Sequence, residues 1–196
     1  MNLRKWLIVF VLLITSILVV SCGGGSSGTS SGGSGNNSLT ISLTDSPFSD
    51  AKAVLVTFSQ VQIHSSGGSW VTVPFPGGDG TRTCDLKKLA GSQDVLGIGP
   101  LMPGHYTMIR LVVSQSTLYF DNQSTGPVCG PFIAPPPGLN ASLTIPSGDI
   151  RLNREFDLST TKSTSILLDF DGDRSIIRTG NNNYKMNPVI GIVSVQ

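Results

Sequence analysis

Residues 150–158 read IRLNREFDL, and this stretch decides the fold class because its apolar and polar side chains alternate. Such alternation places apolar side chains on one face of a β-strand and polar side chains on the face that meets water. Residues 39–44 (LTISLT) and 166–170 (ILLDF) have the same pattern. Three amphipathic strands far apart in the chain predict a sheet protein with one buried and one wet face on each sheet.

Other segments of the sequence predict further strands, a bulge and a hairpin turn. The apolar positions of residues 53–64 change parity near Ser59 and Gln60, which predicts a β-bulge that keeps both halves facing the core. Residues 65–69 (SSGGS) predict a hairpin turn into a strand at 70–73, and residues 105–113 are apolar on both faces, as in a central strand. We expect an all-β sandwich, immunoglobulin-like or prealbumin-like, with about seven to nine strands and one short helical turn at 85–90 that stops at Gly91.

Composition narrows the classes of function. The 196 residues are 39% hydrophobic and 13% charged, with a formal net charge of +1. Since basic residues are not in excess and do not cluster, nucleic acid is not expected as a partner. The scarcity of strong helix formers argues against a helical bundle.

The N-terminus predicts export. Arg4 and Lys5 precede an apolar run from Trp6 to Val20, which as a helix is shorter than a hydrocarbon core of roughly 30 Å. Residues 19–22 (VVSC) resemble the lipobox of bacterial lipoproteins, in which the cysteine receives lipid, including palmitate, and becomes the N-terminus. We therefore expect a signal peptide at 1–21 and lipidation of Cys22, with an uncleaved anchor as the alternative.

The next segment predicts a tether. Residues 22–38 hold the cysteine and a Gly/Ser-rich stretch without apolar side chains to bury, and residues 39–196 form the predicted sandwich domain. Gly23 stands where an aspartate would signal retention in the inner membrane under the enterobacterial sorting rule. The expected location is the cell envelope, at the outer membrane, facing the periplasm or the cell surface.

Two cysteines remain once Cys22 carries lipid. Cys84 and Cys129 are expected to form a disulfide in an oxidising compartment, which closes a loop of roughly 45 residues and pins the segment at 126–131 (GPVCGP). Two free buried thiols are the alternative interpretation.

Asp169, Asp171 and Asp173 are the best candidate for a metal site. Alternation puts Asp169 and Asp171 on one face, and Asp173 follows in the turn, so three carboxylates could hold calcium. The spacing does not match an EF-hand loop, and pairing with Arg174 or Arg178 at a solvated strand end is the alternative. No other cofactor is expected.

His64 and His105 are the only histidines, and each lies near a predicted strand end. Nothing in the sequence fixes a serine in a strained turn beside either one, so a catalytic triad has no local signature. An aromatic surface for glycan or peptide could come from the side chains that core packing also explains, Trp70, Tyr106, Tyr119, Phe120 and Tyr184.

Several short motifs follow one another in a fixed order: LTDSP at 43–47, VQIH at 61–64, LMPGHYTMIRL at 101–111, LDFD at 168–171 and NPVI at 187–190. Their order and spacing resemble the bacterial lipoprotein family catalogued as domain of unknown function 4382, over most of residues 39–195. The Pro-Gly-His-Tyr turn at 103–106 also resembles turns of prealbumin-like sandwich domains. The resemblance implies a β-sandwich lipoprotein and supplies no catalytic residues.

The sequence thus predicts a non-enzymatic, membrane-anchored lipoprotein whose domain binds a glycan or an envelope protein, or serves a structural role there. A calcium-stabilised adhesion module and a hydrolase using His64 or His105 are the alternatives.

Overall fold

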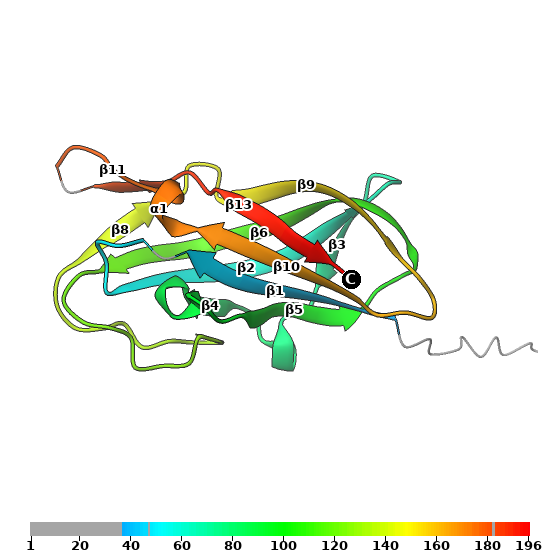
Figure 1. The fold of residues 1–196 in the computed structure, drawn as a ribbon, viewed down its shortest axis with the longest axis horizontal. Helices are drawn as coiled ribbons and strands as arrows, with labels where there is room; N and C mark the ends of the chain where they lie inside the picture. Colours follow the sequence, from blue (N-terminus) through cyan, green and yellow to red (C-terminus); the bar gives the residue numbers. More distant parts are fainter. Residues whose placement is uncertain (1–36, 47, 182) are drawn as a thin grey trace, which may run out of the picture. The chain divides into compact units, whose positions relative to one another are not determined.

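The computed structural model describes residues 37–46, 48–181 and 183–196 as a two-sheet β-sandwich (Figure 1). The smaller sheet has the strand order β13-β10-β1-β5, with bounds Ile190–Val195, Thr164–Asp171, Ser38–Ser46 and Asp94–Pro100. In this sheet β1 pairs in parallel with β10 and antiparallel with β5. The predicted fold class, an all-β sandwich, is confirmed.

The larger sheet has nine strands, seven of them in the order β11-β12-β8-β6-β2-β4-β7. In that order the bounds are Ile176–Arg178, Tyr184–Met186, Asn140–Thr144, Gly104–Tyr119, Ala53–Ser65, Arg82–Asp85 and Cys129–Gly130. The remaining two strands are β3 (Trp70–Val73), which pairs with β2, and β9 (Asp149–Leu158), which pairs with β6. The long strands β2 and β6 form the centre of this sheet.

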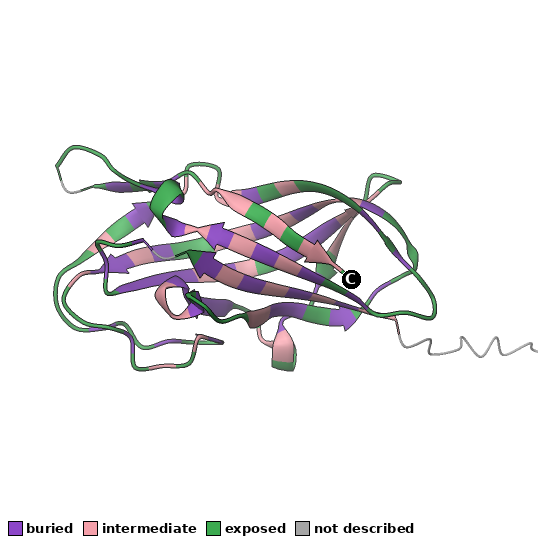
Figure 2. Cartoon of the chain, in the orientation of Figure 1, coloured by how far each residue is buried: buried purple, intermediate pink, exposed green. Residues whose placement is uncertain are grey.

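Alternate residues of the two sheets meet in one core. On β1 the side chains of Leu39, Ile41 and Leu43 are fully buried, and the threonines and serine between them are only partly buried. Figure 2 shows the same alternation of buried and more accessible positions along β1 and β10. Phe58 of β2 and Phe170 of β10 are the largest fully buried side chains, one from each sheet. The predicted amphipathic strands at 39–44, 150–158 and 166–170 are therefore confirmed.

The predicted bulge in β2 is also confirmed. The register between β2 and β6 shifts on both sides of Phe58, before Gln60. As a result Val56, Phe58 and Val61 all face the core, although strict alternation would have turned Val61 outward. The hairpin at 65–69 forms as expected, with the Ser65 amide donating to the Ser69 carbonyl.

The helical content is slightly larger than predicted. The expected turn is a 3-10 helix, η2 (Leu86–Leu89), whose N-cap is Asp85. Gly91 follows with φ of 70°, a conformation that favours glycine and ends the turn. A 3-10 turn η1 (Pro76–Gly78) and a four-residue helix α1 (Gly172–Ser175) were not predicted.

Two other expectations differ from the structure. The described residues form thirteen strands where seven to nine were expected, because β4, β7, β8, β11 and β12 are too short for alternation to show in the sequence. Strict alternation along β6 would put Tyr106 on the face opposite Ile109, yet both are buried, since a register shift between Tyr106 and Met108 turns the tyrosine inward. There Tyr106 stacks on Phe156 with ring centroids 5.5 Å apart.

The predicted disulfide is present. Cys84 of β4 and Cys129 of β7 are register partners and are bonded to each other, 45 residues apart in sequence. The bond fixes the short strand β7 to the edge of the larger sheet. It thereby holds the long segment between β6 and β8 against the sheet.

We expect removal of the disulfide in a Cys84→Ala/Cys129→Ala variant to lower the free energy of unfolding by ~3–4 kcal/mol, because the unfolded chain regains the entropy of a 45-residue loop. Denaturant unfolding of the full-length chain in mild detergent measures this change. The single variant Met102→Ala, at an exposed position, is the control and should unfold like the unsubstituted chain. A double variant as stable as the unsubstituted chain would contradict the expectation.

Candidate functional site

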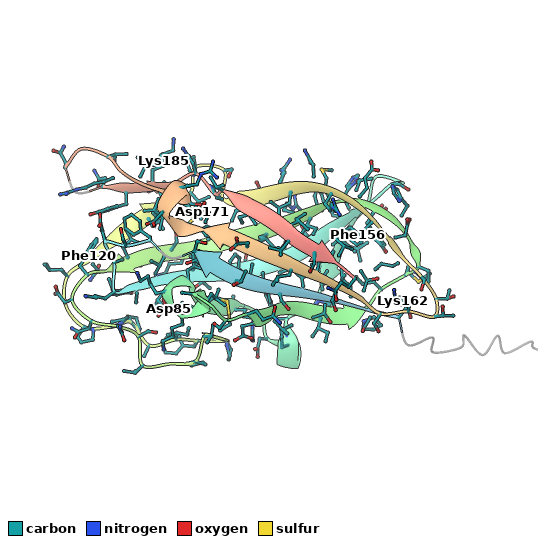
Figure 3. The ribbon with its side chains drawn as sticks, in the orientation of Figure 1. Asp85, Phe120, Phe156, Lys162, Asp171 and Lys185 are labelled. Atoms are coloured by element: carbon teal, nitrogen blue, oxygen red, sulfur yellow. A yellow bond between two sulfur atoms is a disulfide. The ribbon has the colours of Figure 1, made fainter. Side chains whose placement is uncertain are left out.

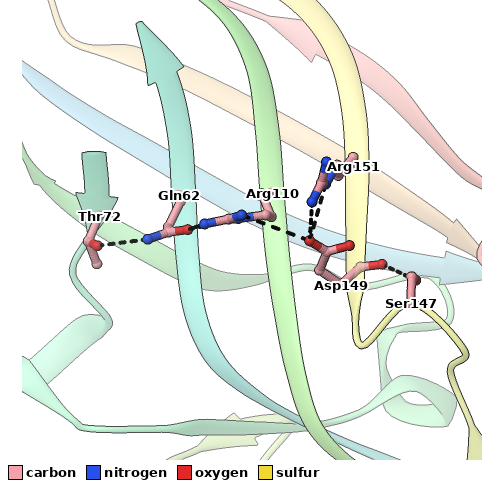
Figure 4. A network of polar contacts seen from close by, with 6 residues as sticks. All are labelled: Gln62, Thr72, Arg110, Ser147, Asp149 and Arg151. Carbon is pink, nitrogen blue, oxygen red and sulfur yellow. Dashed lines mark hydrogen bonds and ion pairs between the residues drawn. The ribbon is translucent and has the colours of Figure 1, made fainter. Parts of the chain in front are cut away.

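The outer face of the larger sheet carries a row of polar side chains across four neighbouring strands (Figure 4). Cross-strand register places Gln62 of β2 opposite Thr72 of β3 on one side and Arg110 of β6 on the other. The Gln62 amide nitrogen lies 3.4 Å from Thr72 Oγ1, and Arg110 Nε donates to Gln62 Oε1 at 2.8 Å. Arg110 Nη2 donates to the same oxygen.

The row continues into β9. Arg151 donates to Asp149 Oδ2 through both Nε and Nη2, at 3.1 and 3.0 Å, and Arg110 Nη1 lies 4.0 Å from the same oxygen. The Arg110 guanidinium also lies 4.3 Å from the centroid of the Trp70 ring, in cation-π geometry. Two arginines share one carboxylate, so the row leaves one positive charge, and the Arg151 side chain is 59% exposed.

A second feature of this face is the segment that joins β6 to β8, residues 120–139. Asp85, fully buried, connects it to the core (Figure 3). Asp85 Oδ2 accepts from Ser124 Oγ at 2.6 Å, while Oδ1 accepts from the backbone amides of Val54 and Lys87, both at 3.1 Å. Lys88 Nζ donates to the Gly126 carbonyl. Together with the disulfide, these bonds fix the segment in place.

A pocket of about 180 Å³ lies between this segment and the strands beneath it. Its polar side chains come from three strands and the residue before β4, and its apolar side chains come partly from residues 131–135 of the segment. Polar and apolar groups that converge in a concavity are typical of small-molecule sites.

Asp45, at the end of β1, is the most perturbed ionisable group. The pKa of its carboxyl is raised to about 8, chiefly by burial and also by the charges of Asp169 and Asp171, while the Gly172 amide and Lys87 act in the opposite direction. Neither carboxylate oxygen makes a hydrogen bond of regular geometry within the described residues. Gly172 is required here, since a Cβ at this position would lie 2.7 Å from the Phe48 amide nitrogen.

Two of the three predicted calcium ligands, Asp171 and Asp173, have other partners. Asp169 and Asp171 share a face of β10, as expected, but Asp171 caps α1 by accepting from the Arg174 amide at 3.0 Å. The Arg174 guanidinium lies 3.9 Å from Asp171, and Asp173 accepts from the Ser49 amide at 2.9 Å. Within the described residues no three His, Cys, Asp or Glu side chains are grouped so that they could hold a metal ion. A shared cation site at Asp169, Asp171 and Asp173 thus has no geometric support.

The two histidines bond to different partners. His64 Nδ1 is 3.0 Å from Thr107 Oγ1, and its ring contacts Trp70 edge-on at 5.0 Å. His105 Nδ1 is 2.9 Å from Asp157 Oδ1 in an exposed pair. In the described part of the chain neither histidine has a serine hydroxyl within hydrogen-bond distance.

The aromatic residues do not form one platform. Trp70 lies on the outer face beside Arg110, Tyr106 is in the core, and Tyr119 is buried under the 120–139 segment with Leu55. Phe120 and Tyr184 contact each other at 5.6 Å near the end of the sandwich.

Comparison with known proteins agrees with the family resemblance of the short motifs. A family model described as "Domain of unknown function (DUF4382)" matches residues 36–188. The chain belongs to the DUF4382 family. No curated protein and no solved structure matches it.

The predicted signal peptide, Cys22 and the tether up to residue 36 lie outside the described residues of this DUF4382 protein. The last two residues of the predicted tether already belong to the folded domain, since Ser38 begins β1 and the Asn37 side chain donates to the Leu101 carbonyl. Across the part that is described, none of the helices has the length and apolar character needed to cross a membrane.

In this DUF4382 domain, sequence reasoning missed Asp45, the Arg110 row and the pocket. Asp45 continues the alternating pattern of β1 and therefore falls on the buried face of the strand. A carboxylate at a buried position is a sign of a perturbed pKa, and the sequence alone could have shown it. The row and the pocket depend on strand register, which the sequence did not give.

Stability of the DUF4382 domain should fall as pH rises from about 4 to about 8. In this range the folded state keeps a proton on Asp45 that the unfolded chain releases, which costs at most ~1.4 kcal/mol per pH unit. Asp45→Asn should flatten this dependence and raise stability at pH 8 by a few kcal/mol. Thermal unfolding of the full-length chain between pH 4 and 8 measures both effects.

Asp50→Asn, at an exposed position on the loop after β1, is the matched control and should keep the original pH profile. If Asp45→Asn is destabilised at pH 8, or has the same slope as the unsubstituted chain, the role assigned to Asp45 is wrong.

Proposed function

We propose that this protein is a non-enzymatic binding module of the bacterial cell envelope, held at a membrane by lipid on Cys22. The observation that carries the proposal is the pocket under the disulfide-anchored segment 120–139, on the outer face of the larger sheet. A rigid, concave, partly polar surface that is already formed in the free protein suits ligand binding, because little ordering entropy is lost on association.

The segment that covers the pocket lies at the end of the domain far from Ser38, where β1 starts (Figure 1). Nine residues of extended strand place Ser46 roughly 26 Å from Ser38. The 120–139 segment starts near the Ser46 end, since it follows Tyr119, whose carbonyl accepts from the Lys52 backbone amide, and its Ser124 donates to the buried Asp85 carboxylate. In Figure 1 this segment and the β11–β12 turn lie at the end opposite the start of β1.

The Arg110 row supports the same function. Its hydrogen bonds hold Gln62, Arg110 and Asp149 in fixed positions across β2, β6 and β9, which gives the outer face a second ordered polar surface, farther along β2 and β6 than the pocket. Side chains that are already ordered contribute to binding without an added entropy loss.

Lipidation can be tested by metabolic labelling. The full-length chain expressed in a bacterial host should incorporate labelled palmitate and sediment with membranes, and Cys22→Ser should lose both properties. Cys84→Ser/Cys129→Ser should keep the label, which separates lipidation from other cysteine chemistry. Label retained in Cys22→Ser, or absent from the unsubstituted chain, would refute the anchor.

Binding and hydrolysis are distinguished in one experiment. The full-length chain in mild detergent, immobilised and exposed to an envelope extract of its own organism, should retain envelope glycans or proteins and leave ester, peptide and glycoside substrates intact. Turnover that disappears in His105→Ala would instead support the hydrolase alternative, because His105 and Asp157 already form a pair. Retention of no envelope component would overturn the binding proposal.

A further inference from the structure

The floor of the pocket is a cross-strand array of uncharged polar groups. Thr83 of β4 is the register partner of Thr57 in β2, and Thr57 is the register partner of Gln115 in β6. Thr57 Oγ1 and Thr83 Oγ1 are hydrogen-bonded at 2.9 Å. Thr117, two residues beyond Gln115, adds another hydroxyl to the floor. Each hydroxyl both donates and accepts, and the Gln115 amide offers two donors and an acceptor.

The wall of the pocket is apolar and fixed. Ile133 is buried in a small cluster with Leu55 and Tyr119, so the segment is packed onto the strands next to the floor. The Cys129 amide also donates to Asp94 Oδ2 at 3.1 Å, which adds to the disulfide at the start of the wall. Phe132, in contrast, is 70% exposed although it lines the pocket, so its ring is available to a ligand.

The charge of the lining restricts the ligand. None of the residues that line this pocket is ionisable at neutral pH; besides the threonines and Gln115 they are Leu55, Tyr119, Pro131, Phe132, Ile133 and Pro135. An anionic or cationic group placed there would lose water without gaining a countercharge. The pocket therefore selects a neutral ligand.

The array of hydroxyl and amide groups further restricts the chemical class of the ligand. A ring with several hydroxyls and an apolar face can hydrogen-bond to Thr57, Gln115 and Thr117 while it packs against the exposed Phe132 ring. An extended peptide would need the unpaired amides and carbonyls of a strand edge, and this pocket opens on the face of paired strands β2 and β6. A saccharide fits both requirements.

From these features we infer that the pocket under the 120–139 segment binds one unit of a neutral saccharide, with Phe132 as the stacking residue and Thr117 among the hydrogen-bonding groups. This inference rests on the proposed binding function and specifies its ligand and its site.

The test uses the full-length chain in mild detergent with neutral oligosaccharides of glucose, mannose, galactose and N-acetylglucosamine as probes. Oligogalacturonate serves as a charged counterpart of the galactose oligomer. At least one neutral oligomer should bind, and the charged counterpart should bind at least tenfold more weakly.

Two substitutions locate the site. Phe132→Ala and Thr117→Val should each weaken binding of the neutral oligomer about tenfold, because the first removes the stacking ring and the second removes a hydroxyl at nearly constant volume. Leu139→Ala is the matched control, since Leu139 is 71% exposed on the same segment but does not line this pocket, and its affinity should stay within about twofold of the unsubstituted chain. Because Phe132 is exposed, Phe132→Ala should keep the melting temperature of the unsubstituted chain.

The outcomes separate the two proposals. Binding of a neutral oligomer that is unchanged in both variants would refute the pocket assignment and leave the binding function standing. If the chain retains only charged glycans or peptides from the envelope, the assignment of a neutral saccharide as the ligand is refuted. Failure of the chain to retain any envelope component would refute the proposed function together with this inference.

Discussion

The structure depends on the burial of alternate side chains from two sheets against each other. Phe58 of the larger sheet and Phe170 of the smaller sheet are fully buried, and β1 adds three fully buried aliphatic side chains between them. A slip of one residue in either sheet would turn these side chains into water, so the core fixes the register of every long strand. The bulge around Phe58 is needed to keep β2 facing this core along its whole length.

This core leaves the outer face of the larger sheet free to carry polar groups in fixed positions. Asp85 and the disulfide then connect the core to the 120–139 segment, since Asp85 bonds both Val54 of β2 and Ser124 of the segment. A long connection whose regular structure is limited to the two-residue strand β7 is thus held in place as the wall of the pocket. The pocket beneath it is a product of packing, and no single sequence motif encodes it.

The sequence predicted the features that depend on local pattern. The alternating strands, the bulge near Ser59 and the helical turn after Asp85 all follow from side-chain periodicity or capping, and the disulfide follows from the number of cysteines left after Cys22. The pocket could not be predicted, because Thr57, Thr83 and Thr117 meet only through the pairing of β4, β2 and β6. The raised pKa of Asp45 comes chiefly from its burial between the sheets, and the parallel pairing of β1 with β10 adds the charges of Asp169 and Asp171 from a distant part of the chain.

The central claim is that the protein works by binding at the disulfide-anchored pocket. Amide hydrogen exchange of the full-length chain, measured with and without the neutral glycan fraction of its own envelope, tests this claim most directly. The account predicts that exchange slows at Gln115–Thr117 and at residues 132–134, with little change on the smaller sheet. Slowed exchange confined to β13 or β5, at the edges of the smaller sheet, would contradict it.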